Sequence, residues 1–328
     1  MKNMFPIFVI TAVVVVGAMA QAQQPAKIPR IGFLTPFSVS DPQNALRLDA
    51  FRQGLRDLGY VEGKNITVEY RFTEGRQDRL PDLVAELVRL KVEAIITSST
   101  PGVLAAKNAS STIPIVIVAI ADPVGNGIVT SLARPGGNVT GLTILAPELS
   151  GKRLELLKEV VPKISRVAVL GHVANPSHEN SFKEMEVAAQ SLGLQLQLVN
   201  VGGPNDFENA LATMKIKRAQ ALILLVDALF TGNAKKIADL AAKNGLPTMY
   251  PWSEFVESDG LMAYGPNFAG QYHRAAYYVD KILRGTKPAD LPVEQPKKFE
   301  FIINLKAAKQ IGLTIPPNVL ARADRVIK

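Results

Sequence analysis

Residues 92–123 constrain the fold of this chain more strongly than any other stretch. They contain two continuous apolar, β-branched runs, Val92 to Thr97 and Ile113 to Ile120, with a helix-forming segment between them. Such runs suit strands that are buried on both faces of a parallel sheet rather than half-exposed antiparallel strands. The stretch therefore predicts a strand–helix–strand unit of a parallel sheet.

Polar turns follow both of these strands. The first strand runs into Ser98, Ser99 and Thr100, where a hydroxyl can cap a helix that has Pro101 in its first turn. The second strand ends at Asp122, which precedes a proline. Ligands of open parallel sheets bind beyond the carboxyl ends of the strands, so we expect a binding site at these two turns.

Strand and helix patterns alternate along the chain in two successive series. The first series predicts strands at residues 28–34, 65–72, 92–97, 113–120 and 139–145, and the second at residues 166–171, 194–201, 221–226, 247–252 and 261–264. Helical patterns separate them, including residues 41–58, 154–161, 182–192 and 269–283, and a last helix is expected near residues 305–311. Two such series predict an α/β protein with two doubly wound parallel-sheet lobes and a ligand cleft between them, rather than one closed barrel.

The expected lobes are discontinuous in sequence. Lobe 1 comprises residues 28–145 plus about 267–294, and lobe 2 comprises residues 146–266 plus about 295–328. A chain that returns in this way turns the carboxyl ends of both sheets toward a shared cleft. The candidate ligand-binding residues at these ends are Phe37, Ser98, Ser99, Thr100, Asp122, Asn175, Asp227, Tyr250 and Trp252.

The polar candidates have a structural and a functional interpretation. Ser98, Ser99 and Thr100 could only cap a helix, or they could hold a carboxylate together with the free N–H groups of the helix start. Asp122 and Asp227 could belong to a turn and a helix cap, or they could bind an ammonium group. The sequence alone leaves both interpretations open.

The remaining candidates also have two interpretations. Phe37, Tyr250 and Trp252 could be core or hinge residues, which is the common fate of aromatic side chains, or they could line a pocket. Trp252 is the only tryptophan of the chain and follows a predicted strand. Asn175 precedes a proline, which favours a structural turn first and a ligand contact second.

The first residues have the layout of a secretory signal peptide. Lys2 is followed by an uncharged apolar run from Phe5 to Ala20, and small residues there suit cleavage after Ala20 or Ala22. An uncleaved anchor is the alternative, but the run is shorter than the ~20 residues that span a bilayer. We therefore expect residues 1–22 to be removed and the protein to be periplasmic.

Composition excludes several classes of protein. The chain contains no cysteine, which rules out disulfides and thiolate metal sites. Its net charge of +8 is dispersed, with no basic cluster interleaved with aromatic residues, so no nucleic-acid partner is expected. The histidines, His172, His178 and His273, lack metal-ligand spacing, and no nucleotide-binding or serine-hydrolase motif is present. We expect no cofactor and no metal, and a monomer that binds a small molecule.

Four segments resemble a known family. They are EYRFTEGRQDRLPDLVAELV at residues 69–88, IPIVIVAIADPVGNGIVTSLARPGGNVTG at residues 113–141, the Asn175-Pro176 turn, and FEFIINLKAAKQIGLTIPPNVLARADRVI at residues 299–327. Together they resemble the exported substrate-binding proteins of ABC transporters, in the group typified by tryptophan-binding lipoproteins. The chain differs from better-understood members by having no cysteine for lipid attachment, and by having Val226-Asp227-Ala228-Leu229-Phe230 where many relatives have an Asp-Pro step.

The resemblance covers essentially the whole chain and carries several implications. It implies a type I periplasmic-binding fold with three crossings between the lobes. It also implies ligand capture by lobe closure, with an ABC permease in the inner membrane as partner. We therefore predict an exported receptor, and not an enzyme, that binds an amino-acid-like zwitterion or an organic acid.

Other classes of protein fit parts of the sequence. An exported enzyme could use Asp122 and Asp227 as an acid and base pair across the cleft. A sugar-sensing transcription factor on the same fold would need a helix-turn-helix before the first strand, where this chain has the apolar leader. A receptor for a signalling partner instead of a permease is not distinguished by the sequence.

Overall fold

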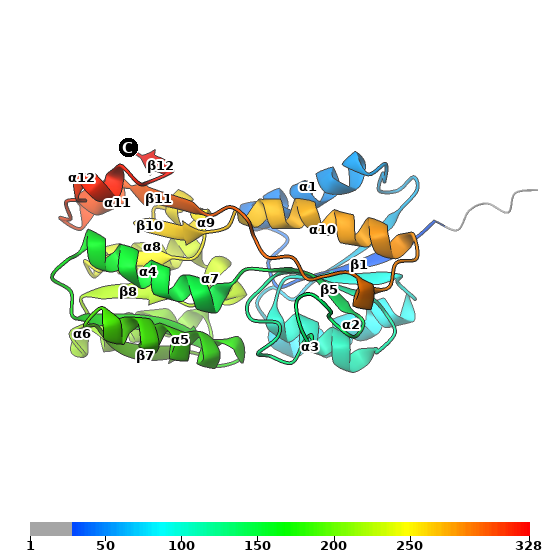
Figure 1. The fold of residues 1–328 in the computed structure, drawn as a ribbon, viewed down its shortest axis with the longest axis horizontal. Helices are drawn as coiled ribbons and strands as arrows, with labels where there is room; N and C mark the ends of the chain where they lie inside the picture. The colour runs from blue at the N-terminus through cyan, green and yellow to red at the C-terminus, as the bar shows by residue number, and fades with distance from the viewer. Residues whose placement is uncertain (1–27) are drawn as a thin grey trace, which may run out of the picture.

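The structure has two α/β lobes that lie side by side along the long axis of the molecule (Figure 1). It is a computed structural model and describes residues 28–328, except for the side chains of residues 146–148. Each lobe is built on a sheet of its own, with five strands in lobe 1 and seven in lobe 2. The predicted two-lobed α/β fold is confirmed, and a single closed barrel is excluded.

The lobe 1 sheet is parallel throughout and has the strand order β2-β1-β3-β4-β5. Its central strands carry the apolar runs seen in the sequence, and every residue of β3 and β4 is buried. Burial on both faces removes the apolar side chains from water and so stabilises the sheet. The strands are β1 (Arg30–Thr35), β2 (Thr67–Phe72), β3 (Ala94–Thr97), β4 (Ile115–Ile120) and β5 (Val139–Thr143).

Helices cover both faces of the lobe 1 sheet. Two of them, α1 and α10, pack together on one face, while α2 and α3 pack on the other. The start of α1 is as predicted, because the Asp41 side chain accepts a hydrogen bond from the Gln43 N–H at 2.9 Å. The helices are α1 (Pro42–Asp57), the 3₁₀ helix η1 (Gln77–Arg79), α2 (Leu80–Arg89), α3 (Thr100–Ala109) and α10 (Phe268–Leu283).

The lobe 2 sheet has the strand order β12-β11-β10-β9-β8-β6-β7. Its segment β7-β6-β8-β9-β10 is parallel and repeats the strand order of lobe 1, while β11 runs antiparallel to β10. The strands are β6 (Arg166–His172), β7 (Gln195–Val201), β8 (Ala221–Leu224), β9 (Thr248–Tyr250), β10 (Met262–Gly265), β11 (Glu300–Asn304) and β12 (Arg325–Ile327).

Helices also cover both faces of the lobe 2 sheet. One face is covered by α4, α5 and the C-terminal helices, and the other by α6, α8 and α9. The helices are α4 (Ala146–Val160), α5 (Ser177–Ser191), α6 (Phe207–Ile216), α7 (Ala228–Thr231), α8 (Ala234–Lys243), α9 (Ser253–Glu257), α11 (Leu305–Gln310) and α12 (Pro317–Leu320), with 3₁₀ turns η2 (Pro204–Asp206) and η3 (Pro288–Asp290).

Several elements differ from the sequence-based expectations. Helix α4 begins at residue 146, before the apolar stripe that predicted a start at residue 154, because a left-handed Leu145 (φ 55°) and a proline in the first turn begin it. Helix α5 begins at Ser177, inside the predicted loop. The tail forms strands β11 and β12, which the sequence analysis did not predict. Their pairing partners lie in lobe 2, so no local turn signal announces them.

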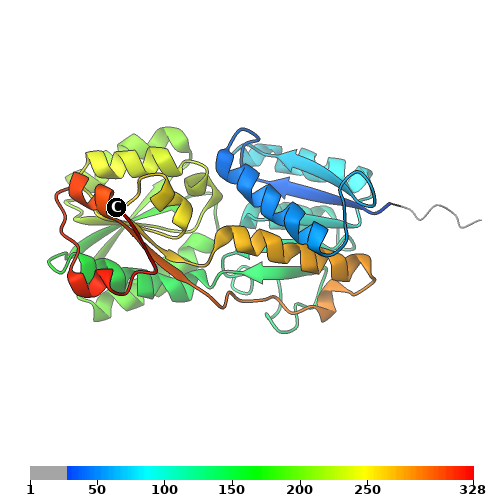
Figure 2. The same cartoon turned by 90° about the horizontal axis from the view of Figure 1, so that it is seen from above.

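Both sheets reverse their strand order at corresponding places, between β1 and β3 in lobe 1 and between β6 and β8 in lobe 2. Such a reversal opens a crevice beyond the carboxyl ends of the flanking strands. The chain passes between the lobes near residues 144–146, 266–268 and 294–299, which separate the last element of one lobe from the first of the other. Figure 2 shows α10 lying beside α1 on lobe 1, and the tail returning to lobe 2.

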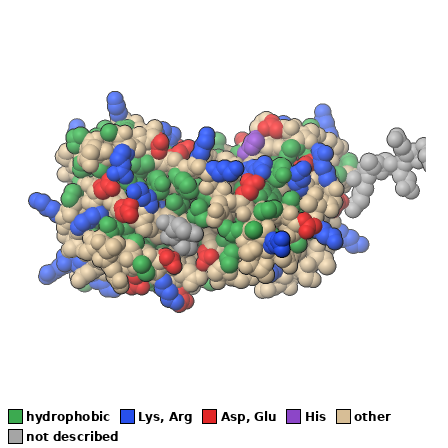
Figure 3. Space-filling view, viewed as in Figure 1, with side chains coloured by type: hydrophobic (Ala, Val, Ile, Leu, Met, Phe, Trp, Pro, Cys, Tyr) green, Lys and Arg blue, Asp and Glu red, His purple; other side chains and the backbone are tan. Residues whose placement is uncertain are grey.

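The surface agrees with the dispersed charge of the sequence. Lysine and arginine side chains are spread over both lobes on the face shown in Figure 3, without a single basic patch. The predicted leader, residues 1–22, lies outside the described residues. Within residues 28–328, no helix is both long and apolar enough to cross a bilayer.

The close approach of α1 to α10 predicts a specific destabilising substitution. A Cβ atom at Gly54 would lie 2.3 Å from the carbonyl oxygen of His273. We expect Gly54→Ala to lower the free energy of unfolding by about 1–3 kcal/mol, because overpacking outweighs the gain in helix propensity. Urea unfolding followed by circular dichroism measures this change. Gly137→Ala is the control, since nothing lies within 4 Å of its Cβ position, and equal stability of the two variants would contradict the prediction.

Candidate ligand-binding site

A cleft lies between the two places where the sheets reverse their strand order. Its cavity volume is about 60 Å³, below the roughly 300–1,000 Å³ of small-molecule pockets, so the cleft is narrow in this arrangement. Lobe 1 contributes residues that follow β1, β3 and β4, and lobe 2 contributes residues that follow β6 and β8. Among the predicted site residues, those that line the cleft are Ser98, Ser99, Thr100, Asn175 and Asp227.

The start of α3 forms the lobe 1 wall of the cleft. Ser99 has an extended backbone (φ −133°) and caps the helix, because its hydroxyl accepts a hydrogen bond from the Gly102 N–H at 3.1 Å. Pro101 has no N–H, so this helix start offers fewer free donors than the sequence suggested. The Ser98 hydroxyl is buried and has no hydrogen-bond partner among the described residues. Ser98 is therefore the free hydroxyl of this wall.

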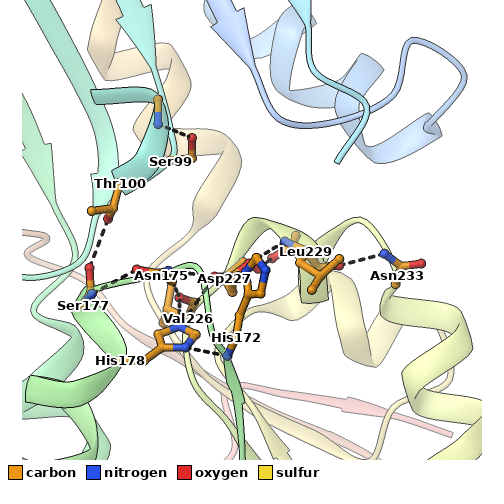
Figure 4. A network of polar contacts seen from close by, with 12 residues as sticks. Ser99, Thr100, His172, Asn175, Ser177, His178, Val226, Asp227, Leu229 and Asn233 are labelled. Atoms are coloured by element: carbon orange, nitrogen blue, oxygen red, sulfur yellow. Dashed lines mark hydrogen bonds and ion pairs between the residues drawn. The ribbon is translucent and has the colours of Figure 1, made fainter. Parts of the chain in front are cut away.

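A buried network around Asp227 forms the lobe 2 wall (Figure 4). The Asp227 carboxylate accepts hydrogen bonds from the Leu229 N–H and from the Asn175 side-chain amide, each at 2.7 Å. Both carboxylate oxygens lie 3.2 Å from Nδ1 of His172. Asp227 thus caps α7, as one interpretation of the sequence held, and also fixes the two neighbouring side chains that line the cleft.

His178 contacts the backbone of His172 and Val226 in this network, and these contacts define its tautomer. Its Nδ1 accepts a hydrogen bond from the backbone N–H of His172 at 2.8 Å, so its proton is on Nε2, which donates to the carbonyl oxygen of Val226 at 3.0 Å. Burial lowers the pKa of His178, and the nearby Asp227 carboxylate only partly offsets this effect. His178 is therefore held in its neutral form.

The two lobes touch through hydrogen bonds beside the cleft. The Ser177 hydroxyl lies 3.1 Å from the Thr100 hydroxyl, and it accepts a hydrogen bond from the Asn126 amide, also at 3.1 Å. The Asn180 amide donates to the Asp122 carboxylate at 3.2 Å. Because Ser177 and Asn180 belong to lobe 2 and the other three residues to lobe 1, these contacts join the two lobes.

Aromatic side chains are buried deeper between the lobes. The Phe37 ring is covered by the Arg47 guanidinium, whose central carbon lies 4.0 Å from the ring centroid. The Trp252 ring stacks on the Phe268 ring, with the centroids 4.6 Å apart. Since Arg47 also lies 5.1 Å from the Phe268 ring centroid, these four side chains form one continuous aromatic and cationic cluster.

Four predicted site residues do not line the cleft, namely Phe37, Asp122, Tyr250 and Trp252. Phe37 and Trp252 belong to the aromatic and cationic cluster described above. Tyr250 is buried in lobe 2, where its ring stacks on Phe255 with the centroids 4.8 Å apart. Asp122 has a positive φ of 42°, and its carboxylate accepts from the Gly125 N–H at 2.8 Å in addition to its contact with lobe 2. The structural interpretation of Tyr250 and Asp122 is the one that the geometry favours.

The structure also brings in residues that the sequence analysis did not propose, namely His172, Ser177 and Arg47. His172 ends β6, so its position after a strand was a signal, although the analysis weighed it only as a metal ligand. Arg47 lies four residues before Phe51, on the apolar stripe of α1, and a charged residue in such a stripe was also a signal. Ser177 had none, because its partner Thr100 is distant in the sequence.

The buried network predicts a fall in stability at acidic pH. Burial would raise the pKa of Asp227, but the hydrogen bonds from His172 and Asn175 act against it, and its pKa is lowered. The pKa of His178 is lowered as well, so below about pH 6.5 the unfolded chain binds more protons than the folded one. We expect the free energy of unfolding to decrease there by at most about 1.4 kcal/mol per pH unit for one proton.

Urea unfolding at several pH values between 7.5 and 5 measures this slope. His178→Asn should flatten it, whereas His273→Asn, at an exposed pair with Asp57, should keep the wild-type slope. Asp227 adds a decrease of the same sign below about pH 4. A wild-type stability that does not change between pH 7.5 and 5 would contradict the assignment of His178.

Comparison with known proteins agrees with this architecture. A family model described as ABC transporter substrate binding protein matches residues 36–327. A tyrosine-binding protein from Clostridioides difficile (strain R20291) is 26% identical over 264 residues, which are 80% of this chain and 75% of that protein.

Two solved structures are similar over nearly their whole length. A conserved domain protein from Vibrio cholerae O1 biovar eltor is 27% identical, with a TM-score of 0.86, covering 92% of this chain and 100% of that one. An ABC domain from Streptococcus pneumoniae in complex with L-Trp is 25% identical, with a TM-score of 0.84, covering 91% and 99%. Because the family model extends over most of the sequence, the chain belongs to the family of ABC transporter substrate-binding proteins.

Proposed function

We propose that this protein is an exported receptor that captures an aromatic amino acid between its lobes and presents the closed form to an ABC permease. The observation that carries this proposal is the cleft itself, where the strand-order reversals of two sheets face each other with polar walls. Similarity to a tyrosine-binding protein and to an ABC domain in complex with L-Trp supports the ligand class.

The chemistry of the walls suits a zwitterion. The Ser98 hydroxyl and the start of α3 face the cleft from lobe 1 and would hold the carboxylate. Asp227 faces it from lobe 2 and is the better candidate for the ammonium group, since Asp122 does not line the cleft. Phe37 and Trp252 would contact the ring. Both aspartates are already hydrogen-bonded within the protein, which supports binding rather than acid–base catalysis.

Lobe closure is the second part of the proposal. The lobes would rotate about the crossings near residues 144–146, 266–268 and 294–299. A ligand that touches both walls favours the closed form by its differential affinity for the two arrangements. The closed monomer would then be the form that the permease recognises.

A thermal-shift panel tests the ligand class. L-tryptophan, L-tyrosine and L-phenylalanine should raise the melting temperature, because a ligand at 100 times its Kd adds about 2.7 kcal/mol to stability. L-leucine, glutamate and a monosaccharide are the comparison compounds. A rise in melting temperature with one of these comparison compounds, and none with the aromatic amino acids, would contradict the proposed ligand class.

The interlobe contact of Ser177 gives a test of closure that avoids the ligand contacts. Ser177→Ala removes the hydrogen bonds to Thr100 and Asn126, each worth about 0.5–1.5 kcal/mol, so we expect the Kd for the best amino acid to rise about 5- to 100-fold. Isothermal titration calorimetry measures it. Ser191→Ala, at the exposed end of the same helix, should leave the Kd unchanged. Equal affinities of the two variants would argue against closure on this contact.

A further inference from the structure

Arg47 is a buried charge without hydrogen bonds. Its side chain is 1% exposed, and none of its three guanidinium nitrogens that could donate has an acceptor among the described residues. Buried polar groups are nearly always hydrogen-bonded, and a buried cation without a hydrogen-bonded partner is costly. The nearest carboxylate oxygen, Oδ2 of Asp41, lies 3.6 Å from Nη1 and makes no hydrogen bond either, so the protein pairs this cation only incompletely.

The surroundings of Arg47 leave one side of the guanidinium for a further acceptor. The rings of Phe37 and Phe268 lie 4.0 Å and 5.1 Å from it, and these cation–π contacts use its faces rather than its N–H groups. The Asp41 carboxylate is 3.6 Å away and caps α1 with its other oxygen. Burial raises the pKa of Glu254, so this nearby acid from lobe 2 compensates the charge only weakly.

Two buried hydroxyls lie beside the same cluster. The hydroxyls of Tyr272 and Ser98 are both buried, and neither makes a hydrogen bond of good geometry within the described residues, although the two interact with each other. The Tyr272 ring packs edge-on against Phe268, with the centroids 5.4 Å apart. Burial raises the pKa of Tyr272 to about 12, and both the Arg47 charge and the Ser98 hydroxyl act against this rise, so the Tyr272 hydroxyl is within reach of both groups. Ser98 in turn lines the cleft.

We propose that Arg47 is the residue that recognises the ligand carboxylate, with the Tyr272 and Ser98 hydroxyls as its neighbours in the same anion-binding subsite. A planar guanidinium is suited to a carboxylate, because it can donate two parallel hydrogen bonds to it. This inference rests on the proposed function, in that it assumes a carboxylate ligand between the lobes. In this proposal Arg47 supplies the positive charge for the carboxylate, since the hydroxyl groups at the start of α3 are neutral.

A consequence is that Arg47 couples recognition to closure. In the closed arrangement without an anion, the guanidinium is buried and lacks hydrogen bonds, whereas in an open arrangement water can solvate it. The carboxylate removes this penalty only in the closed form. Arg47 thus disfavours closure of the lobes when no ligand is bound, and also when the bound ligand has no carboxylate.

A comparison of L-tryptophan with L-tryptophanamide, which has a neutral amide in place of the carboxylate, tests the recognition. Wild-type protein should bind the acid at least about 30-fold more tightly than the amide, as expected for removal of one partner of a buried charge pair. In Arg47→Met this ratio should fall close to one. Arg52→Met, on the exposed side of the same helix, should keep the wild-type ratio. An unchanged ratio in Arg47→Met would overturn the inference.

Small-angle X-ray scattering without any ligand tests the coupling separately. Arg47→Met should have a smaller radius of gyration than wild-type protein, because closure no longer buries an unpaired cation, and Arg52→Met should match wild type. If wild-type protein binds neither L-tryptophan nor L-tyrosine, the proposed ligand class fails, and the scattering result still decides the role of Arg47. Equal radii for Arg47→Met and wild type would show that Arg47 only packs against the aromatic rings, and would also overturn the inference.

Discussion

Polar groups that the protein leaves unpaired between its lobes govern the behaviour of this structure. In the described residues, the guanidinium of Arg47 and the hydroxyls of Ser98 and Tyr272 are buried without hydrogen bonds. Each such group loses its hydrogen bonds to water on burial, and the contacts that the protein supplies replace them only in part. The closed arrangement is therefore incomplete on its own, and a molecule that carries acceptors completes it. This requirement links the chemistry of the cleft to the movement of the lobes.

The topology places these groups opposite one another. Each lobe contains the same five-strand order, and in each the strands that come first and third along the chain flank the place where the order reverses. Side chains after β1 and β3 therefore meet side chains after β6 and β8 across the cleft. One apolar core cluster is continuous across both lobes, so the proposed rotation of the lobes would also rearrange aromatic contacts such as that of Trp252 with Phe268.

The sequence predicts local features of this site well. Apolar β-branched runs announce the parallel strands, and the hydroxyl cap at Ser99 follows from its place before Pro101. The direction of a side chain is harder to foresee. Tyr250 and Trp252 belong to the same predicted strand. Tyr250 is buried in the core of lobe 2, whereas Trp252 lies beyond the end of the observed strand and stacks on Phe268. A strand of three residues has too little pattern to fix which face is buried.

Contacts between segments that are distant in the sequence cannot be predicted from local sequence patterns. Ser177 meets Thr100 because two helices that begin in different lobes approach each other at their first turns, and no spacing in the sequence encodes that approach. The tail strand β11 likewise depends on the edge offered by β10. Arg47 is an intermediate case, because it lies four residues before Phe51 on the buried face of α1, but the sequence analysis did not single it out, and only the structure shows that no carboxylate of the described residues lies within hydrogen-bonding distance.

The two kinds of interlobe contact act on closure in opposite directions. In the proposed closing movement, the hydrogen bonds of Ser177 and Asn180 would favour the closed form by about 1 kcal/mol each, whereas burying the Arg47 cation with only a 3.6 Å ion pair to Asp41 would cost more than this. The first term is too small to close the empty lobes against the second. Once a carboxylate pairs with Arg47 the penalty disappears, and the same weak hydrogen bonds are sufficient to hold the lobes together. Under this proposal, the ligand would increase the population of the closed form in two ways. Its own contacts with both lobes would stabilise that form, and its carboxylate would remove the free-energy cost of burying Arg47.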